Sequence, residues 1–147
     1  MFTPSPRRLL PIVLAYLPVP IAGAALSIAW GVGASPEGGP ADLPFSGTAL
    51  APPLFLPVLL VGAAALARRP GTAGRVGAAV VSLVATAFLA GSTLNLPNDF
   101  AAAESAGTPI ALSATLAVVH IVLSVALLAN ALPTVLGRRQ DGSLRPA

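Results

Sequence analysis

The sequence contains no cysteine and no lysine, and it has one histidine and one tryptophan. The absence of cysteine excludes disulfide bonds, thiolate metal sites and cysteine nucleophiles. Charged residues are also scarce, at 9% of the chain, against roughly 25% in ordinary soluble domains. A soluble helical bundle could not cover its surface with so few charges. The apolar share of 55% instead suits a chain whose solvent is lipid, and 147 residues leave room for one domain only.

Four long apolar stretches divide the chain. They cover residues 9–32, 49–67, 76–94 and 110–136. Because about 20 residues of helix cross a bilayer core of roughly 30 Å, they predict an all-α membrane protein. The expected fold is a single domain over residues 1–147, an up-down bundle of four transmembrane helices. The second stretch opens with several prolines, and counted from Pro53 it is too short for a full span.

The basic residues predict how these helices are oriented. All are arginines, and they lie before the first stretch, between the second and third, and after the fourth: Arg7, Arg8, Arg68, Arg69, Arg75, Arg138, Arg139 and Arg145. The two remaining connections carry only acidic charges, Glu37, Asp42, Asp99 and Glu104. Basic residues are retained on the cytoplasmic side during insertion, so both termini are predicted to be cytoplasmic.

The composition bears on the compartment and on nucleic-acid binding. Abundant Ala, Gly, Pro and Arg indicate a GC-rich bacterial genome, and hence a multi-pass protein of the bacterial plasma (inner) membrane. The arginines form short clusters beside the apolar stretches, where anionic lipid headgroups account for them. Since no basic face extends further along the chain, nucleic acid is not an expected partner.

The first apolar stretch also has features of a signal peptide. Arg7 and Arg8 precede it, and the small residues 22–25 fit a cleavage site. The apolar run continues beyond that site to Trp30, however, and its 24 residues would span about 36 Å as a helix. We therefore expect the segment to be retained as a transmembrane helix, with a cleaved leader as the alternative.

Two stretches carry small residues at a spacing of four, a pattern that lets helix backbones approach closely in lipid. The stripe of the first stretch consists of Gly23, Ser27 and Gly31. The stripe of the third stretch consists of Gly74, Ala78, Ser82, Thr86 and Ala90. Both stripes are predicted to be helix-packing faces.

His120 is the one ionisable residue deep within an apolar stretch, close to the midpoint of the fourth. An ionisable group at that depth suggests a functional site. Ser113 and Ser124 share its helix face, and this face is expected to meet Ser82 and Thr86. These five residues form the candidate ligand-binding set. The alternative is structural: His120 donates a hydrogen bond that fixes the register of the bundle, worth about 0.6 to 2 kcal/mol.

Other kinds of site lack the residues they need. Metal or haem ligation has no second histidine or cysteine, and Met1 is the only methionine, so no metal and no cofactor is expected. Covalent catalysis has no carboxylate to orient His120, so no catalytic residue is assigned. Asp99 and Glu104 are five residues apart and do not share a helix face, so they are interpreted as solvated surface charges.

Three features resemble an uncharacterised family of small four-helix actinobacterial membrane proteins, a group defined by a domain of unknown function. They are the segment 30–33 that closes the first stretch, the pair Arg68-Arg69, and the run 116–122 that contains His120. The resemblance implies residence in a membrane and no assigned activity.

The leading functional hypothesis is therefore a non-enzymatic structural or accessory protein. It would pack within the lipid bilayer against other membrane proteins or against itself as a homo-oligomer. The alternative is a small-ligand carrier or binding protein with an intramembrane cavity centred on His120, and a membrane enzyme is third. A defined protein partner that co-purifies in mild detergent favours the first hypothesis, and a bound lipid or pigment favours the second.

Overall fold

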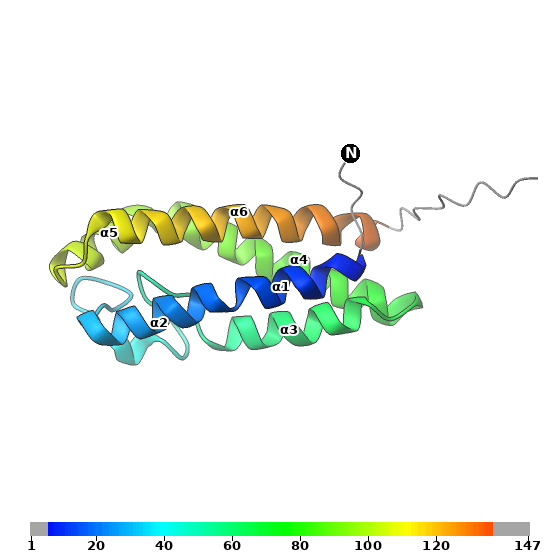
Figure 1. Ribbon diagram of the computed structural model, residues 1–147, viewed down its shortest axis with the longest axis horizontal. Helices are drawn as coiled ribbons and strands as arrows, with labels where there is room; N and C mark the ends of the chain where they lie inside the picture. Colours follow the sequence, from blue (N-terminus) through cyan, green and yellow to red (C-terminus); the bar gives the residue numbers. More distant parts are fainter. Residues whose placement is uncertain (1–5, 137–147) are drawn as a thin grey trace, which may run out of the picture.

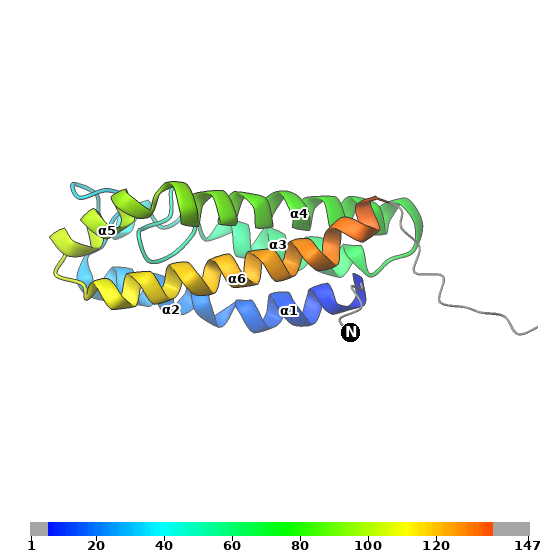
Figure 2. The ribbon, with the colours of Figure 1, turned by 90° about the horizontal axis from the view of Figure 1, so that it is seen from above.

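The computed structural model describes residues 6–136, and this part of the chain is helical apart from turns, loops and an isolated bridge between Thr48 and Ala51. Its elements are η1 (Pro6–Arg8), α1 (Leu9–Tyr16), α2 (Pro18–Trp30), η2 (Pro40–Asp42), α3 (Phe55–Ala67), α4 (Gly71–Leu94), α5 (Leu96–Ser105) and α6 (Ile110–Val135). The long helices lie side by side in an elongated bundle, with α5 at one end and the turn between α3 and α4 at the other (Figures 1 and 2). The predicted all-α fold is confirmed.

Three helical segments are long and apolar enough to cross a membrane. They are Pro6–Trp30 with 25 residues, α4 with 24 and α6 with 26, and they correspond to the first, third and fourth predicted stretches. The first is interrupted at Leu17, directly before the proline that opens α2. Large apolar side chains such as Ile21 and Leu83 are exposed along the spans. Lipid accommodates such a surface, whereas water does not.

The second predicted stretch, residues 49–67, forms a helix that is shorter than the apolar sequence itself. Helix α3 begins at Phe55 and has 13 residues, which rise about 20 Å and so fall short of a core of roughly 30 Å. Pro52 and Pro53 lack a backbone N–H and disfavour helix at the residue before each of them. Pro57 is tolerated because it lies in the first turn, where N–H groups have no partner within the helix.

The segment before α3 folds back against α2 at the end of the bundle that α3 does not reach. Its Leu50 is buried, and its Thr48 Oγ1 lies 2.6 Å from Ser27 Oγ in a hydrogen bond. The backbone of Leu50 lies so close to Gly23 that a Cβ there would collide with it. The first small-residue stripe therefore packs against this loop, and its third member, Gly31, ends α2 with a φ of 68°.

Helices α4 and α6 form the most extensive helix pair of the bundle. The buried side of α4 consists of Gly74, Gly77, Ala78, Val81, Val84, Ala85 and Phe88. Of the predicted stripe, only Gly74 and Ala78 are fully buried, whereas Ser82 is half-buried and Thr86 is exposed. Steps of four residues advance about 400° around a helix, so the stripe drifts by about 40° per step and leaves the packing face. Within the described chain, the stripe is therefore a helix-packing face at Gly74 and Ala78, and whether the rest of it packs against a partner stays a prediction.

Candidate ligand-binding cavity

Polar side chains lie along the buried face of α6. Ser113, His120 and Ser124 are all at most 6% exposed, and they share one face, as their spacing indicates. Asn130 extends this line toward the far end of the helix, and its Nδ2 donates to the Ala126 carbonyl at 2.8 Å. A helix of membrane-spanning length thus presents a polar row to the protein interior, although large apolar side chains such as Val118 and Val122 are exposed on its outward face.

The hydrogen bond of His120 lies within its own helix. Its Nδ1 is 2.8 Å from the carbonyl oxygen of Leu116, and because a carbonyl can only accept, Nδ1 carries the proton. In the neutral ring Nε2 is then an acceptor. This Nε2 is buried and has no hydrogen-bond partner among residues 6–136. The hydrogen bond between elements that the structural hypothesis required of His120 is therefore not made within the described chain.

Three rings meet at His120 and join three helices. The His120 ring is 5.5 Å from the Tyr16 ring of α1 at an interplanar angle of 80°, and 6.5 Å from the Phe88 ring of α4 at 73°. Tyr16 and Phe88 are themselves 5.6 Å apart. Edge-to-face contacts of this kind are favourable, and they hold the imidazole in place. The position of His120 thus depends on ring packing, while its Nε2 keeps a free lone pair.

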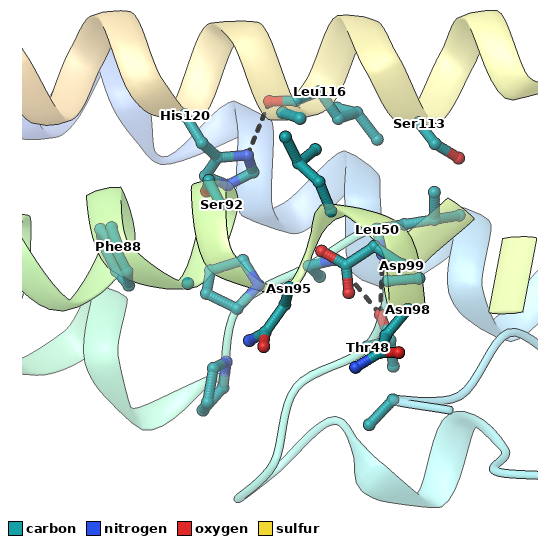
Figure 3. Close-up of a pocket in the computed structure, with 18 of the residues that line it drawn as sticks. Thr48, Leu50, Phe88, Ser92, Asn95, Asn98, Asp99, Ser113, Leu116 and His120 are labelled. Atoms are coloured by element: carbon teal, nitrogen blue, oxygen red, sulfur yellow. Dashed lines mark hydrogen bonds between the residues drawn. The ribbon is translucent and has the colours of Figure 1, made fainter. Parts of the chain in front are cut away.

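A cavity of about 370 Å³ extends from His120 toward the α5 end of the bundle. Residues 48–53, the beginning of α3, the end of α4, α5 and the beginning of α6 form its walls (Figure 3). Its volume lies within the range of roughly 300–1,000 Å³ that is usual for small-molecule sites. The cavity lies beside the loop that precedes α3, so the late start of this helix accounts for the space.

The cavity is amphipathic. Its apolar lining includes Leu50, Pro53, Leu56, Ala87, Phe88 and Leu116. Its polar lining includes Ser92, Asn95, Asn98, Asp99, Ser113 and His120. In Figure 3 the His120 ring extends inward from α6, and Asp99 lies with Asn95 and Asn98 toward the α5 end. A ligand in this cavity would contact apolar walls along its middle, with His120 at one end and Asp99, Asn95 and Asn98 at the other.

The five residues of the candidate set do not all gather at the cavity. His120 and Ser113 line it, and the Ser113 hydroxyl is buried without a partner in the described chain. Ser124 is buried one turn beyond His120 and does not line the cavity. Ser82 and Thr86 lie on the side of α4 that turns away from the packed interior. The cavity therefore brings together two members of the set.

Asp99 was interpreted from the sequence as a solvated surface charge, but the structure places it at the cavity. It is half-buried and lines the cavity, because α5 folds back against the beginning of α6. Burial raises the pKa of Asp99 to about 6. Its carboxylate has no hydrogen bond or ion pair among residues 6–136. The turn residues 95–98 could have indicated this position, because they predict a short helix after α4, and that helix carries Asp99 back toward the bundle.

Metal binding and kinship give no further assignment. Within residues 6–136, no three histidine, aspartate or glutamate side chains lie close enough together to hold a metal ion. No protein-family model matches the chain, and no curated protein or solved structure matches it significantly. The resemblance to the actinobacterial four-helix family stays a prediction.

Proposed function

We propose that this protein binds a small, largely apolar molecule that carries a hydrogen-bond donor. The observation that supports this most strongly is the buried Nε2 of His120, an acceptor at the wall of a cavity that has no hydrogen-bond partner among residues 6–136. Leaving such a group unpaired costs about 1–3 kcal/mol, and a donor on a ligand would recover that free energy. Ligand binding, the alternative in the sequence analysis, thus becomes the preferred function.

The proposed setting is the plasma membrane of a bacterium, with both termini cytoplasmic. In Figure 1 the beginning of α1, the turn between α3 and α4 and the end of α6 lie together at one end of the bundle. That turn carries Arg68 and Arg69, and basic residues favour the cytoplasmic side. Residues 49–54 together with α3 would complete a fourth crossing, with irregular backbone tolerated because most of residues 49–53 line the cavity or are buried in protein. The α5 end of the cavity would then face the outer side.

The lining restricts the chemistry of the ligand. Nε2 of His120 can only accept in the neutral ring, so the ligand must donate to it. The Ser113 hydroxyl can donate or accept, and the walls between these groups are apolar. Phenols and alcohols with a hydrocarbon body satisfy this pattern, whereas ethers and hydrocarbons do not.

A matched pair of probes tests the proposal. The purified protein in mild detergent is heated with 4-ethylphenol or with 4-ethylanisole, which keeps the apolar body but has no donor. The phenol is expected to raise the unfolding temperature of the wild type, and the ether is not. His120→Phe should abolish the effect, while Ser124→Ala, a neighbour on the same helix face outside the cavity, should keep it.

The contrary result is equally clear. If the phenol and the ether shift the unfolding temperature equally in the wild type and in both variants, the probes only partition into the detergent and the hydrophobic surface. The His120 cavity would then not be a binding site for donors.

The second candidate, packing with a partner in the membrane, rests on α4. Ala79 and Thr86 are exposed there and Ser82 is half-buried, which leaves small side chains on an outward face where another helix could approach closely. Thr86→Leu should then shift the oligomeric state measured by light scattering in detergent, while Val122→Leu on the outward face of α6 should not. An unchanged mass for both variants would remove the support for this role.

A further inference from the structure

We propose that the ligand of this cavity is a small organic cation whose ammonium group binds Asp99 while its hydrogen-bond donor reaches His120. The inference rests on the proposed function, since it assigns a charge to the molecule that occupies the same cavity.

The position of Asp99 provides the first step. It lines the cavity from α5, and its carboxylate is not used by any hydrogen bond or ion pair of residues 6–136. Asn95 and Asn98 line the cavity beside it, and their amide carbonyls are further acceptors. An ammonium group has three donors and no acceptor. This end of the cavity therefore offers the acceptors that a primary ammonium needs.

The charges around Asp99 are all of one sign. The other acids at this end of the described chain are Glu37, Asp42 and Glu104. Asp42 accepts a hydrogen bond from the backbone N–H of Ala34 at 3.0 Å and does not line the cavity. Glu37 and Glu104 are exposed and also lie outside the cavity. Asp99 is thus the acid that a ligand in the cavity can reach, and the field of its neighbours attracts cations and repels anions.

No arginine of the described chain can neutralise Asp99. Arg7 and Arg8 lie in η1, Arg68 and Arg69 in the turn between α3 and α4, and Arg75 near the beginning of α4. These segments are at the opposite end of the bundle from α5 (Figure 1). The same lack of a basic partner argues against a phospholipid headgroup, whose phosphate would accompany any ammonium into this acidic end. A free, diffusible cation fits better than a lipid.

Two further polar groups of the same cavity lie on α6, within the reach of one small molecule. Ser113 and His120 both line the cavity and are seven residues apart on α6, which corresponds to about 10 Å of helix rise. Their buried hydroxyl and imidazole nitrogen both lack partners in the described chain. Because these two groups are independent of Asp99, they mark the cavity as a ligand site on separate grounds.

Three phenols that differ in charge test the inference. Tyramine carries an ammonium group opposite its hydroxyl, 4-ethylphenol is neutral, and 3-(4-hydroxyphenyl)propionate is an anion. Their dissociation constants are measured for the wild-type protein in nanodiscs. Charge-assisted hydrogen bonds are about twice as strong as neutral ones, so we expect tyramine to bind about tenfold more tightly than 4-ethylphenol, and the anion more weakly than either.

Two variants assign the effect to one carboxylate. Asp99→Asn should reduce the ratio of the 4-ethylphenol and tyramine dissociation constants from about ten to about one, and circular dichroism in the same nanodiscs checks that the variant is folded. Glu104→Gln removes an exposed acid from the same helix and should leave the advantage intact.

The outcomes separate the two proposals. If 4-ethylphenol binds in a way that depends on His120, but tyramine binds no better or keeps its advantage in Asp99→Asn, the cation inference is refuted and the proposed function stands. If none of the three phenols binds, both are refuted.

Discussion

Replacing His120 by phenylalanine should leave the ligand-free protein as stable as the wild type, or more stable. Phenylalanine keeps an aromatic ring next to Tyr16 and Phe88, whose centroids lie 5.5 and 6.5 Å from the imidazole. It removes the two ring nitrogens. Nδ1 donates to the Leu116 carbonyl, and Nε2 has no hydrogen-bond partner in the described part of the chain.

The magnitude follows from these two nitrogens. The loss of the hydrogen bond to Leu116 should destabilise the fold by about 1 kcal/mol, and that carbonyl still accepts the backbone N–H one turn later. The removal of a buried, unpaired acceptor should stabilise it by about 1–3 kcal/mol. The net change is a gain of roughly 0 to 2 kcal/mol. His120→Leu also loses the ring contacts, worth about 0.5–1.5 kcal/mol, and should be less stable than His120→Phe.

The assay is equilibrium unfolding by sodium dodecyl sulfate in mixed micelles, followed by circular dichroism on protein stripped of bound small molecules. Ser124→Ala serves as the control for removing a buried, unpaired polar atom without touching the cavity. A loss of more than about 1 kcal/mol in His120→Phe, with wild-type stability in His120→Gln, would refute the reasoning. His120 would then serve to fix the register of the bundle.

Three other predictions test the packing, the titration and the orientation. A Cβ on Gly77 would collide with the backbone of α3, so Gly77→Ala should lower the free energy of unfolding by about 1–3 kcal/mol. Gly62 faces open space, so Gly62→Ala should raise it by up to about 1 kcal/mol, and equal effects of the two substitutions would contradict the contact at Gly77. Because the pKa of Asp99 rises from 3.8 to about 6 on folding, its ionisation destabilises the fold above pH 6 and has no effect below pH 3.8. After allowance for solvent screening, Asp99→Asn should therefore add about 1 kcal/mol at pH 8 and nothing near pH 3.5, and an equal gain at both would count against the burial of this carboxyl. Cysteines introduced at Ser46 and Thr72, both exposed, should differ in labelling by an impermeant maleimide on intact cells, with Ser46 labelled and Thr72 protected; the reverse pattern would invert the orientation.

Much of the fold could be predicted because lipid imposes a simple rule on the sequence. A long apolar run with charged ends must form a helix in order to satisfy its backbone, and three of the four predicted stretches do form helices of spanning length. The second stretch, residues 49–67, is the exception, because Pro52 and Pro53 delay the start of its helix until Phe55. A hydropathy pattern does not detect this shortening of the helix, since proline interrupts the helix without making the segment polar.

The site was only partly predictable, because most of it depends on tertiary packing. His120 is visible in the sequence as an ionisable residue at bilayer depth, and Ser113 follows from helical periodicity. Thr86 was placed at the site by a spacing of four, which does not stay on one helix face. Tyr16 reaches His120 only through the packing of α1. Asp99 reaches the cavity only because α5 folds back against the bundle. No local sequence pattern encodes either contact.

The most direct test of the central claim uses the fact that the chain has one histidine. Protein labelled with ¹⁵N-histidine gives a single pair of imidazole nitrogen signals, and these are recorded with and without 4-ethylphenol. If the phenol donates to Nε2 of His120, the signal of this unprotonated nitrogen should move strongly upfield while Nδ1 stays nearly constant, and 4-ethylanisole should move neither. If the phenol leaves Nε2 unchanged at saturating concentration, or if the ether shifts it equally, His120 does not receive a ligand and the proposed function is wrong.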